Sequence, residues 1–393
     1  MILDKLFQLM AEKQASDIFI SAGMPIHIKI QGNTLPVNQQ LMDSAMIEKI
    51  AFELMSPDQI RTFEATMEMN LSFGVPNIGN FRINIFRQRA SISIVVRYIL
   101  GNIPALDTLA LPPVLAELIM ERRGLILIVG STGSGKSTTI ASMLDHRNAN
   151  RSGHILTIED PIEFLFKHKK SIVNQRELGM DTLGWEPALK NAMRQAPDCI
   201  LIGEIRDKET MQAAIAYAQT GHLCLATLHA NNSYHALNRV INFFPLDTRT
   251  SLYLDLSASL KAIVSQRLVR KPDGKRTPAA EVLLNTRHVQ ELIENGEVLA
   301  VKEAMEQSLA PGSQTFEQDL FRLYREGIIT LDEALANADS PTNLSWLINN
   351  SEITNNAQNE EKHSEIPLDF SETNSGGTSF KEFALNMDDG SEA

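Results

Sequence analysis

The stretch that decides the fold is Gly130-Ser131-Thr132-Gly133-Ser134-Gly135-Lys136-Ser137. It matches the pattern G-x-x-x-x-G-K-[ST], which is informative when it lies between a strand and a helix. Residues 125–129 before it form a continuous apolar run, which predicts a buried parallel strand. Residues 137–144 after it contain no Gly or Pro and predict the start of a helix. Both flanking elements are therefore expected, and the stretch is predicted to bind a nucleotide.

The residue types of this loop suit phosphate binding. Glycines let backbone N–H groups turn inward around phosphate oxygens, at a helix N-terminus whose partial positive charge favours anions. Lys136 can reach the β- and γ-phosphates, and the Ser137 hydroxyl can ligate Mg²⁺. Thr138 completes the part of the loop that we expect to hold ATP and Mg²⁺. The alternative, a Gly/Ser loop that matches by chance, does not explain the two flanking elements.

Bulk composition indicates a globular protein of two or three domains. The chain has 393 residues, of which 43% are hydrophobic and 21% charged, an ordinary balance for such a protein. Its formal net charge is −12, and residues 351–393 hold ten Asp or Glu against two Lys or Arg. The rest of the chain is nearly balanced, so nothing indicates a nucleic-acid partner.

The sequence also predicts a cytoplasmic protein. Cys199 and Cys224 lie apart in apolar segments and are expected to be core thiols in a reducing compartment. No apolar run approaches the length of a transmembrane segment. The first ten residues carry charges at Asp4 and Lys5 and no small-residue cleavage site, so no signal peptide is expected.

The pattern along the chain predicts an α/β protein with a small α+β domain at 1–100, a linker at 101–113, a nucleotide-binding domain at 114–350 and a disordered acidic tail at 351–393. In the first domain we expect helices at 3–10 and 43–55, another after Ser56-Pro57, and strands at 17–21, 26–30, 71–73, 81–86 and 91–98. Strands at 125–129, 154–158, 199–202 and 223–227 alternate with helices and predict a parallel sheet, followed by helices at 252–269, 289–294 and 316–325.

Two acidic clusters follow predicted strands of that sheet. Glu159 and Glu163 come at the end of the strand at 154–158, and carboxylates there face the ligand crevice of an α/β sheet. Either glutamate could orient or deprotonate an attacking water, or the acids could merely cap a turn. Glu204 follows the apolar strand at 199–202, where a carboxylate can meet Mg²⁺ or its water shell.

Histidines and arginines complete the candidate residues. His222 and His229 bracket the strand at 223–227, and an imidazole there could sense the γ-phosphate or relay its presence. Lone histidines are more often structural, but two around one strand of the nucleotide sheet favour function. The first domain carries Arg82, Arg87, Arg89 and Arg97. A solvated strand face would explain them, although phosphoryl transfer gains from an arginine supplied by another domain or subunit.

Together these clusters resemble the secretion-superfamily ATPases that drive type II secretion and type IV pili. The string from Arg194 to Asp207, with Gly203-Glu204-Ile205-Arg206, is similar to the family's signature. The resemblance covers residues 1 to about 345 and implies a PAS-like N-terminal domain followed by a RecA-like ATPase domain, in a homo-hexamer with nucleotide between the domains. It further implies that Glu163 is the catalytic base, that Glu204 is the atypical Walker B acid, and that Arg82 and Arg97, less surely Arg89, neutralise charge.

Within the family the chain resembles the retraction branch, PilT and PilU. Assembly and secretion members carry an extra N-terminal domain and a four-cysteine zinc element, whereas this chain has only two isolated cysteines. The segments Thr220–Asn232 and Phe243–Pro245 are more similar to PilU. Residues 289–296 lack the Ala-Ile-Arg-type motif of PilT, which favours the accessory PilU type.

The resemblance therefore implies an ATPase that powers or assists pilus retraction and twitching motility, at the cytoplasmic side of the inner membrane. Its expected partners are a PilT-type ATPase and the pilus platform protein of that membrane. A nucleotide-dependent regulatory or scaffold subunit with little motor activity is the alternative. A DNA translocase is disfavoured by the acidic balance of the chain.

Overall fold

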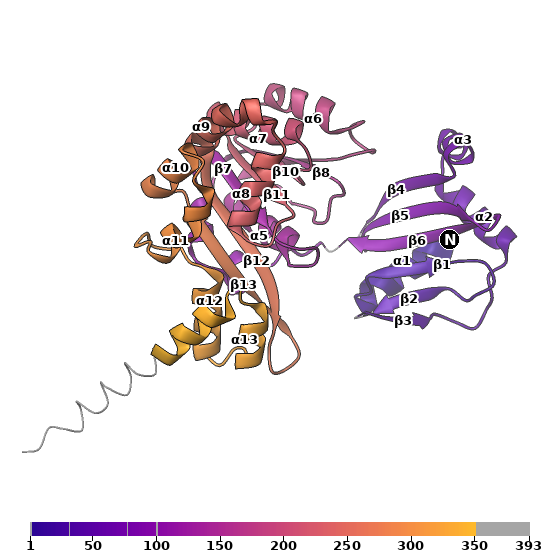
Figure 1. The fold of residues 1–393 in the computed structure, drawn as a ribbon. Helices are drawn as coiled ribbons and strands as arrows, with labels where there is room; N and C mark the ends of the chain where they lie inside the picture. The colour runs from indigo at the N-terminus through magenta and orange to yellow at the C-terminus, as the bar shows by residue number, and fades with distance from the viewer. Residues whose placement is uncertain (1, 31, 77, 100, 351–393) are drawn as a thin grey trace, which may run out of the picture. The chain divides into compact units, whose positions relative to one another are not determined.

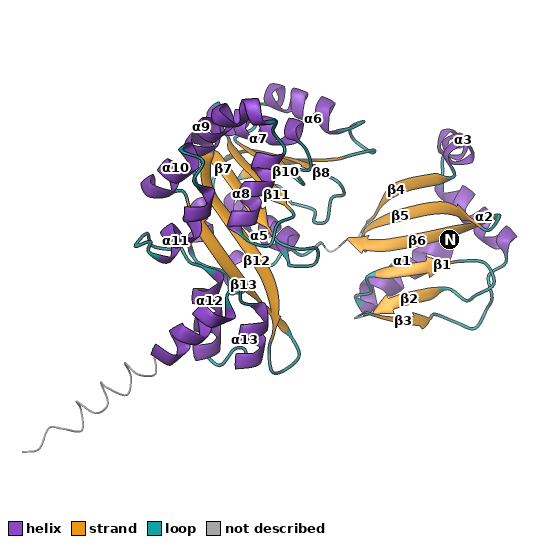
Figure 2. Ribbon diagram, viewed as in Figure 1, coloured by secondary structure: helices purple, strands orange, loops and turns teal. Residues whose placement is uncertain are grey.

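The computed structural model describes residues 2–30, 32–76, 78–99 and 101–350. Those residues form a mixed α/β protein with two separate sheets (Figure 2). The α/β fold class is therefore confirmed. The domain boundaries expected near residues 100, 113 and 350 stay predictions, and the expected disordered tail at 351–393 lies outside the described residues.

The first sheet is six-stranded and antiparallel, in the order β3-β2-β1-β6-β5-β4. Its strands are β1 (Asp17–Ile20), β2 (His27–Ile30), β3 (Asn33–Pro36), β4 (Glu68–Val75), β5 (Gly79–Gln88) and β6 (Ser91–Ile99). All five strands expected from the sequence are present, and the fully exposed β3 was not expected. On β5 the alternate residues Phe81, Ile83 and Ile85 face the core, as strand pleating requires.

Three helices pack with this sheet: α1 (Ile2–Lys13), α2 (Ser44–Leu54) and α3 (Pro57–Thr66). Phe7 of α1 stacks on Phe81 of β5, with ring centroids 4.2 Å apart. Ser56 caps α3 in a reciprocal capping box with Gln59, and Pro57 opens the helix. Local sequence signals therefore placed these helices correctly.

The second sheet has seven strands in the order β13-β12-β7-β11-β10-β8-β9. They are β7 (Gly124–Val129), β8 (Gly153–Glu159), β9 (Ser171–Glu177), β10 (Cys199–Ile202), β11 (Leu223–Leu228), β12 (Leu260–Arg270) and β13 (Arg276–Leu284). Neighbours are parallel except for the antiparallel pair β12–β13. The four strands expected here are present, whereas β9, β12 and β13 were not expected.

The helix expected at 252–269 is wrong in its second half. Helix α9 (Arg249–Ser259) ends at residue 259, and the chain continues as β12 (Figure 1). An apolar run fits a buried strand as well as a buried helix, and here pairing with β7 on one side and β13 on the other buries Ile263 and Val264 completely. Pairing with β7 and β13 therefore decided that this apolar run forms a strand and not a helix.

The remaining helices cover the second sheet or follow it. They are α4 (Val114–Leu118), α5 (Lys136–Asn150), α6 (Trp185–Ala192), α7 (Lys208–Gln219), α8 (Ser233–Asn242), α10 (Arg287–Glu294), α11 (Val301–Glu306), α12 (Phe316–Arg325) and α13 (Leu331–Asn337). Helix α12 packs on β13, and α13 packs on both α12 and β12 (Figure 1). The helices expected at 289–294 and 316–325 are present as α10 and α12.

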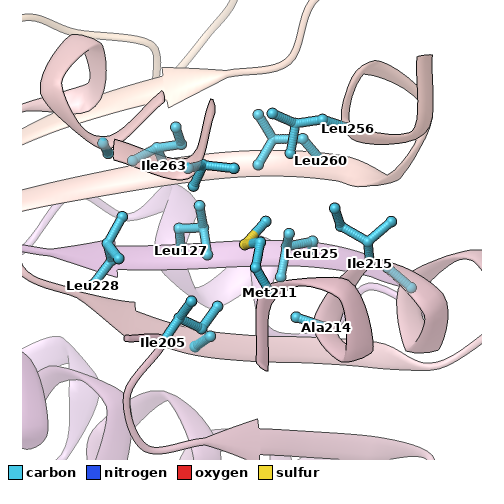
Figure 3. Packing of buried hydrophobic residues seen from close by; sticks show 14 of the residues in the cluster. Leu125, Leu127, Ile205, Met211, Ala214, Ile215, Leu228, Leu256, Leu260 and Ile263 are labelled. Carbon is cyan, nitrogen blue, oxygen red and sulfur yellow. The ribbon is translucent and has the colours of Figure 1, made fainter. Parts of the chain in front are cut away.

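Strand β7 is buried on both faces, as a central parallel strand should be. Leu125 and Leu127 point into one core, where they meet Met211 and Ile215 of α7 (Figure 3). Alternate residues of β7 point into a second core on the other face. This double packing holds the loop that follows β7 in a fixed place.

Cys199 and Cys224 are both buried and free, as expected for core thiols. Burial raises the pKa of the Cys199 thiol to about 11. Among the described helices, none is long and apolar enough to cross a membrane.

Candidate active site

The candidate site lies where the carboxyl ends of four parallel strands meet. Strand β7 leads into Gly130, β8 ends at Glu159, and β11 ends one residue before His229. Strand β10 ends two residues before Glu204. Because β11 lies between β7 and β10, the Glu204 strand is about 10 Å from the strand that leads into the loop. Open α/β sheets bind ligands in the crevice at the carboxyl ends of their strands, which is where these residues lie.

A cavity of about 220 Å³ occupies this edge. It is lined by Thr132, Gly133, Lys136, Ser137, Ile140, Ala141, Glu159, Asp160, Pro161, Glu163, Phe164, Phe166, Leu201, Gly203, Glu204, Thr227 and His229. Loop residues, three glutamates and one histidine from the candidate set therefore share one cavity. Its mixture of a lysine with several carboxylates suits a phosphate ester that is accompanied by a cation.

The glycines of the loop are required by its path. Gly133 and Gly135 have φ of 78° and 93°, in the left-handed region that favours glycine. A Cβ on Gly135 would lie 2.7 Å from Nε2 of Gln266 on β12, and a Cβ on Gly130 would lie 2.6 Å from the Gln266 carbonyl oxygen. The Gln266 side chain also accepts a 2.7 Å hydrogen bond from Thr139 Oγ1. Strand β12 therefore packs directly against the loop and leaves no room for side chains at Gly130 and Gly135.

Lys136 lies at the start of α5 and is buried. Its Nζ donates to the carbonyl oxygens of Gly130 and Ser131, at 2.9 and 2.8 Å. Burial lowers the pKa of Lys136, while the charges of Glu204 and Glu163 oppose that shift. Ser134 Oγ is also buried, and it has no hydrogen-bond partner within the described part of the chain. The loop thus presents an ammonium group and an unsatisfied hydroxyl.

Glu204 is held between two basic side chains. Arg206 Nε donates to Glu204 Oε2 at 2.7 Å, and His229 Nε2 lies 3.3 Å from Oε1. Arg206 also lies 3.9 Å from Asp160 and so connects the ends of β10 and β8. The hydrogen bond to Glu204 is the main reason that the pKa of Arg206 is raised. Both oxygens of the Glu204 carboxylate therefore have a partner in this state.

Gly203, just before Glu204, allows two strand ends to approach closely. A Cβ at this position would lie 3.1 Å from the Ile158 carbonyl oxygen and from Glu159 Cα. The Gly203 carbonyl accepts a hydrogen bond from Thr227 Oγ1 of β11. A larger residue here would displace the end of β8 and its acids, which explains why glycine precedes the glutamate.

Glu159 and Glu163 belong to the same short segment but differ in environment. Glu159 is half-buried, and its desolvation raises its pKa to about 7, although hydrogen bonds from Thr157 (2.6 Å) and Gln175 (3.3 Å) oppose the shift. The backbone N–H of Glu163 also donates to the Glu159 carboxylate. Glu163 itself is exposed and lines the cavity. The half-buried Glu159 therefore orients the backbone that carries the exposed Glu163.

The structure does not bring His222 to this cavity. His222 precedes β11 at its amino end, where its carbonyl accepts from the Gly124 N–H at the start of β7. Its Nδ1 lies 3.2 Å from both the Thr220 hydroxyl and the Tyr217 carbonyl. Six strand residues separate it from His229, a distance of about 20 Å. Of the two histidines expected beside the nucleotide, His229 is among the described residues that line the cavity and His222 is not. The expectation that His222 lies at the nucleotide site therefore disagrees with its position, and the role of His229 stays a prediction.

Arg82 and Arg97 are directly opposite each other on β5 and β6. Arg97 Nε donates to Asp17 Oδ1 at 2.9 Å, and Arg82 Nη2 lies 4.0 Å from Glu177 Oε1. Each arginine therefore faces a carboxylate, which offsets the unfavourable pairing of like charges across the two strands. Neither arginine is among the described residues that line the cavity. Arg89 has a left-handed backbone (φ 46°) at the β5–β6 turn.

Mg²⁺-ATP fits the groups that are present. The loop offers the Lys136 ammonium, the Ser134 hydroxyl, which has no hydrogen-bond partner among the described residues, and Gly130 and Gly135, at which a side chain would clash. Ser137 and Glu204 line the same cavity and could hold the metal and its water. No cluster of three or more His, Cys, Asp or Glu among residues that the structure describes could hold a metal alone.

Several supporting residues were not predicted from the sequence. Arg206 was visible in the signature string, but its contact with Glu204 required the fold. Gln266 carried no signal, because its segment was expected to be helical. The different positions of the histidines could have been inferred, since His222 precedes a parallel strand and His229 follows it.

Comparison with known proteins decides the family. The model of the family described as "Type II/IV secretion system protein" matches residues 1–336. The chain belongs to this family. It is 48% identical over 349 residues to the type IV pilus ATPase PilU of Pseudomonas aeruginosa, covering 88% of this chain and 91% of that relative. It is 37% identical over 343 residues to the type IV pilus ATPase PilT of the same organism, covering 87% of this chain and 100% of the relative.

A solved structure agrees with this placement. The pilus retraction motor PilT with bound ADP matches at a TM-score of 0.81 and 40% identity, covering 87% of this chain and 98% of the other. The predicted membership of the PilT/PilU branch is thus confirmed, with higher identity to PilU than to PilT among the Pseudomonas relatives. As a member of this ATPase family, the chain is a P-loop ATPase.

Proposed function

We propose that this protein is a hexameric, Mg²⁺-dependent ATPase that powers or assists the retraction of type IV pili, in the manner of a PilU-type accessory motor. The observation that carries the proposal is the near full-length similarity to PilU, in a chain whose loop, acids and His229 share one cavity. The proposed setting is the cytoplasmic face of the inner membrane. The proposed partners are a PilT-type ATPase and the platform protein of the pilus.

In the proposed mechanism, Lys136 and Ser137 bind and orient the phosphates. Bound Mg²⁺-ATP supplies the γ-phosphoryl group and a metal that neutralises its charge. Thr132 and Gly133 line the cavity beside Lys136, and Glu204 would hold a water of the bound metal. Glu163, the exposed acid, accepts the proton of the attacking water. Glu159 holds the Glu163 backbone through its carboxylate.

His229 and the arginine pair have separate proposed roles. His229 lies against Glu204 and reports whether the γ-phosphate is present. Arg82 and Arg97 lie opposite each other on β5 and β6, and we propose that they neutralise the charge that develops during transfer. On this proposal, movement of the domain that carries these arginines couples hydrolysis to mechanical work.

The Glu163→Gln variant tests the proposed base. Its ATP turnover should fall about 10²- to 10⁴-fold, because the amide cannot accept the proton. Binding of a fluorescent ATP analogue should persist, since Glu163 is exposed and is not needed to hold the loop. Glu48→Gln, at an exposed position of α2, is the matched control and should keep normal turnover. Turnover by Glu163→Gln near the wild-type rate would show that the base is assigned wrongly.

A scaffold subunit of the PilT-type motor is the second candidate. The missing Ala-Ile-Arg-type motif at residues 289–296 is the observation that favours it. Cells that carry Lys136→Ala separate the two functions, provided that the variant still assembles with its partner. Loss of assisted retraction supports a motor, whereas unchanged retraction supports a scaffold.

A further inference from the structure

The segment that follows β11 is held at almost every residue. The His229 carbonyl accepts a 2.9 Å hydrogen bond from Arg239 Nη1, and the Asn231 carbonyl accepts a 3.2 Å hydrogen bond from Arg267 Nη2. Asn232 caps α8 through its side-chain oxygen, which accepts from the His235 N–H at 2.9 Å. The segment that carries His229 is therefore fixed from outside the cavity.

Arg267 of β12 is the centre of these contacts. Besides Asn231, it donates to the Asn337 carbonyl at the end of α13 and forms an ion pair with Asp339. Its guanidinium lies over the Phe316 ring of α12, 4.0 Å from the centroid. The side chain is only 22% exposed, so solvent screens these interactions weakly. One arginine thus joins the His229 segment to the two C-terminal helices.

Asp339 closes the connection from the other side. One of its oxygens pairs with Arg267, and the other accepts a 2.6 Å hydrogen bond from the Asn232 side-chain amide. Its side chain is 17% exposed. Asp339 lies two residues beyond the end of α13, so its position depends on how that helix packs on β12. The Asn231–Asn232 end of the 229–232 segment is therefore tied to the C-terminal region, while the His229 end is held by Arg239 of α8.

We propose that the Arg267–Asp339 pair is a latch that positions His229 against Glu204, and that the packing of α12 and α13 thereby controls ATP turnover. The proposal rests on the proposed role of His229. Neither latch residue is among the described residues lining the cavity, so both are positioning residues. A displacement of about 1 Å in a catalytic group can cost roughly 10²-fold in rate, and release of this short segment would allow such a displacement.

The first test is Asp339→Asn, which keeps the side-chain shape and removes the charge that faces Arg267. The kcat for ATP should fall roughly tenfold, while KM and the affinity for a fluorescent ATP analogue stay within about twofold. Asp273→Asn is the matched control, because Asp273 forms an exposed ion pair in the β12–β13 turn. Unchanged kcat with a lower melting temperature would overturn the proposal and leave a purely structural pair.

Arg267→Lys is a second variant, for use if Asp339→Asn does not fold. Lysine keeps the charge opposite Asp339 but loses the planar fork that also reaches the carbonyls of Asn231 and Asn337. Its kcat should fall about two- to fivefold below that of the wild type, while KM stays within about twofold. A wild-type kcat with a lower melting temperature would overturn the latch.

A double-mutant cycle with His229→Ala decides whether the latch acts through His229. In the His229→Ala background, Asp339→Asn should cause no further loss of kcat. If Asp339→Asn lowers kcat by the same factor in the His229→Ala background as in the wild type, the latch proposal is overturned, while the role of His229 is not. Wild-type turnover by His229→Ala would overturn both the role of His229 and the latch. Glu163→Gln reports separately on the rest of the proposed site.

Discussion

The two ends of β11 carry the same residue type in different settings. At the carboxyl end, His229 lies 3.3 Å from Glu204 and lines the cavity beside the loop. At the amino end, His222 contacts Thr220 and Tyr217, and its carbonyl helps to start β7. Six residues of strand separate them. In a parallel sheet the direction of the strand, and not closeness in sequence, decides which histidine meets the ligand.

The same contrast holds for the whole sheet. Its carboxyl edge gathers Lys136, Glu159, Glu163 and Glu204, whereas buried Cys199 and Leu223 begin β10 and β11 at the amino edge. Substitutions at the carboxyl edge should therefore change the rate of ATP turnover. Substitutions at the amino edge should change stability at most.

Lys136→Ala should have the largest effect. It removes the ammonium group of the loop and should lower ATP turnover by at least about 10²-fold. Purified protein assayed for phosphate release checks this. Lys275→Ala, at an exposed site in the β12–β13 turn, is the control and should keep wild-type turnover. A Lys136→Ala protein with more than a tenth of normal activity would remove the loop from the proposed mechanism.

The histidines test the comparison itself. His229→Ala should lower kcat about 10- to 100-fold, because Glu204 loses a partner and the γ-phosphate loses its proposed sensor. His222→Ala should leave kcat within about twofold, because the carboxyl edge is unaffected. Steady-state ATPase assays of both proteins in parallel give the ratio. Equal losses would mean that position along β11 does not separate their roles.

Arg206→Gln should have a smaller effect on the same edge. Arg206 is 54% exposed, so its pairing with Glu204 is worth little, and a two- to fivefold change is expected. Because the variant frees one Glu204 oxygen, the Mg²⁺ concentration that gives half-maximal turnover should fall. A Mg²⁺ titration of ATPase activity measures it. A rise in the Mg²⁺ requirement would show instead that Arg206 aids metal binding.

Glu159→Gln should change the pH dependence of stability more than activity. The pKa of Glu159 is raised from 4.5 to about 7 in the fold, so the native state binds more protons than the unfolded state between those values. The wild-type melting temperature therefore loses this contribution as pH rises from about 4.5 to 7, and Glu159→Gln should flatten that slope. Thermal melts across the window measure the effect. Identical slopes would show that Glu159 is not the group responsible.

Most elements of the fold could be predicted, and β12 shows why one of the exceptions could not. Continuous apolar runs marked β7, β8, β10 and β11, and Ser56-Pro57 marked the start of α3. The run at 260–269 was assigned to a helix because apolar residues alone do not distinguish a buried strand from a buried helix. Strand β12 exists because β7 and β13 pair with it, and those partners are not close in sequence.

The sequence by itself determined the nucleotide loop, the acids that follow β8 and β10, and the family, because each depends on residue types at short, regular spacing. Only the tertiary structure decided that His229 and not His222 joins the cavity, that Arg206 holds Glu204, and that Gln266 supports the loop. It also decided that Arg267 and Asp339 meet the segment after β11. The physical reason is that these contacts join residues distant in sequence, whose meeting depends on strand order and direction.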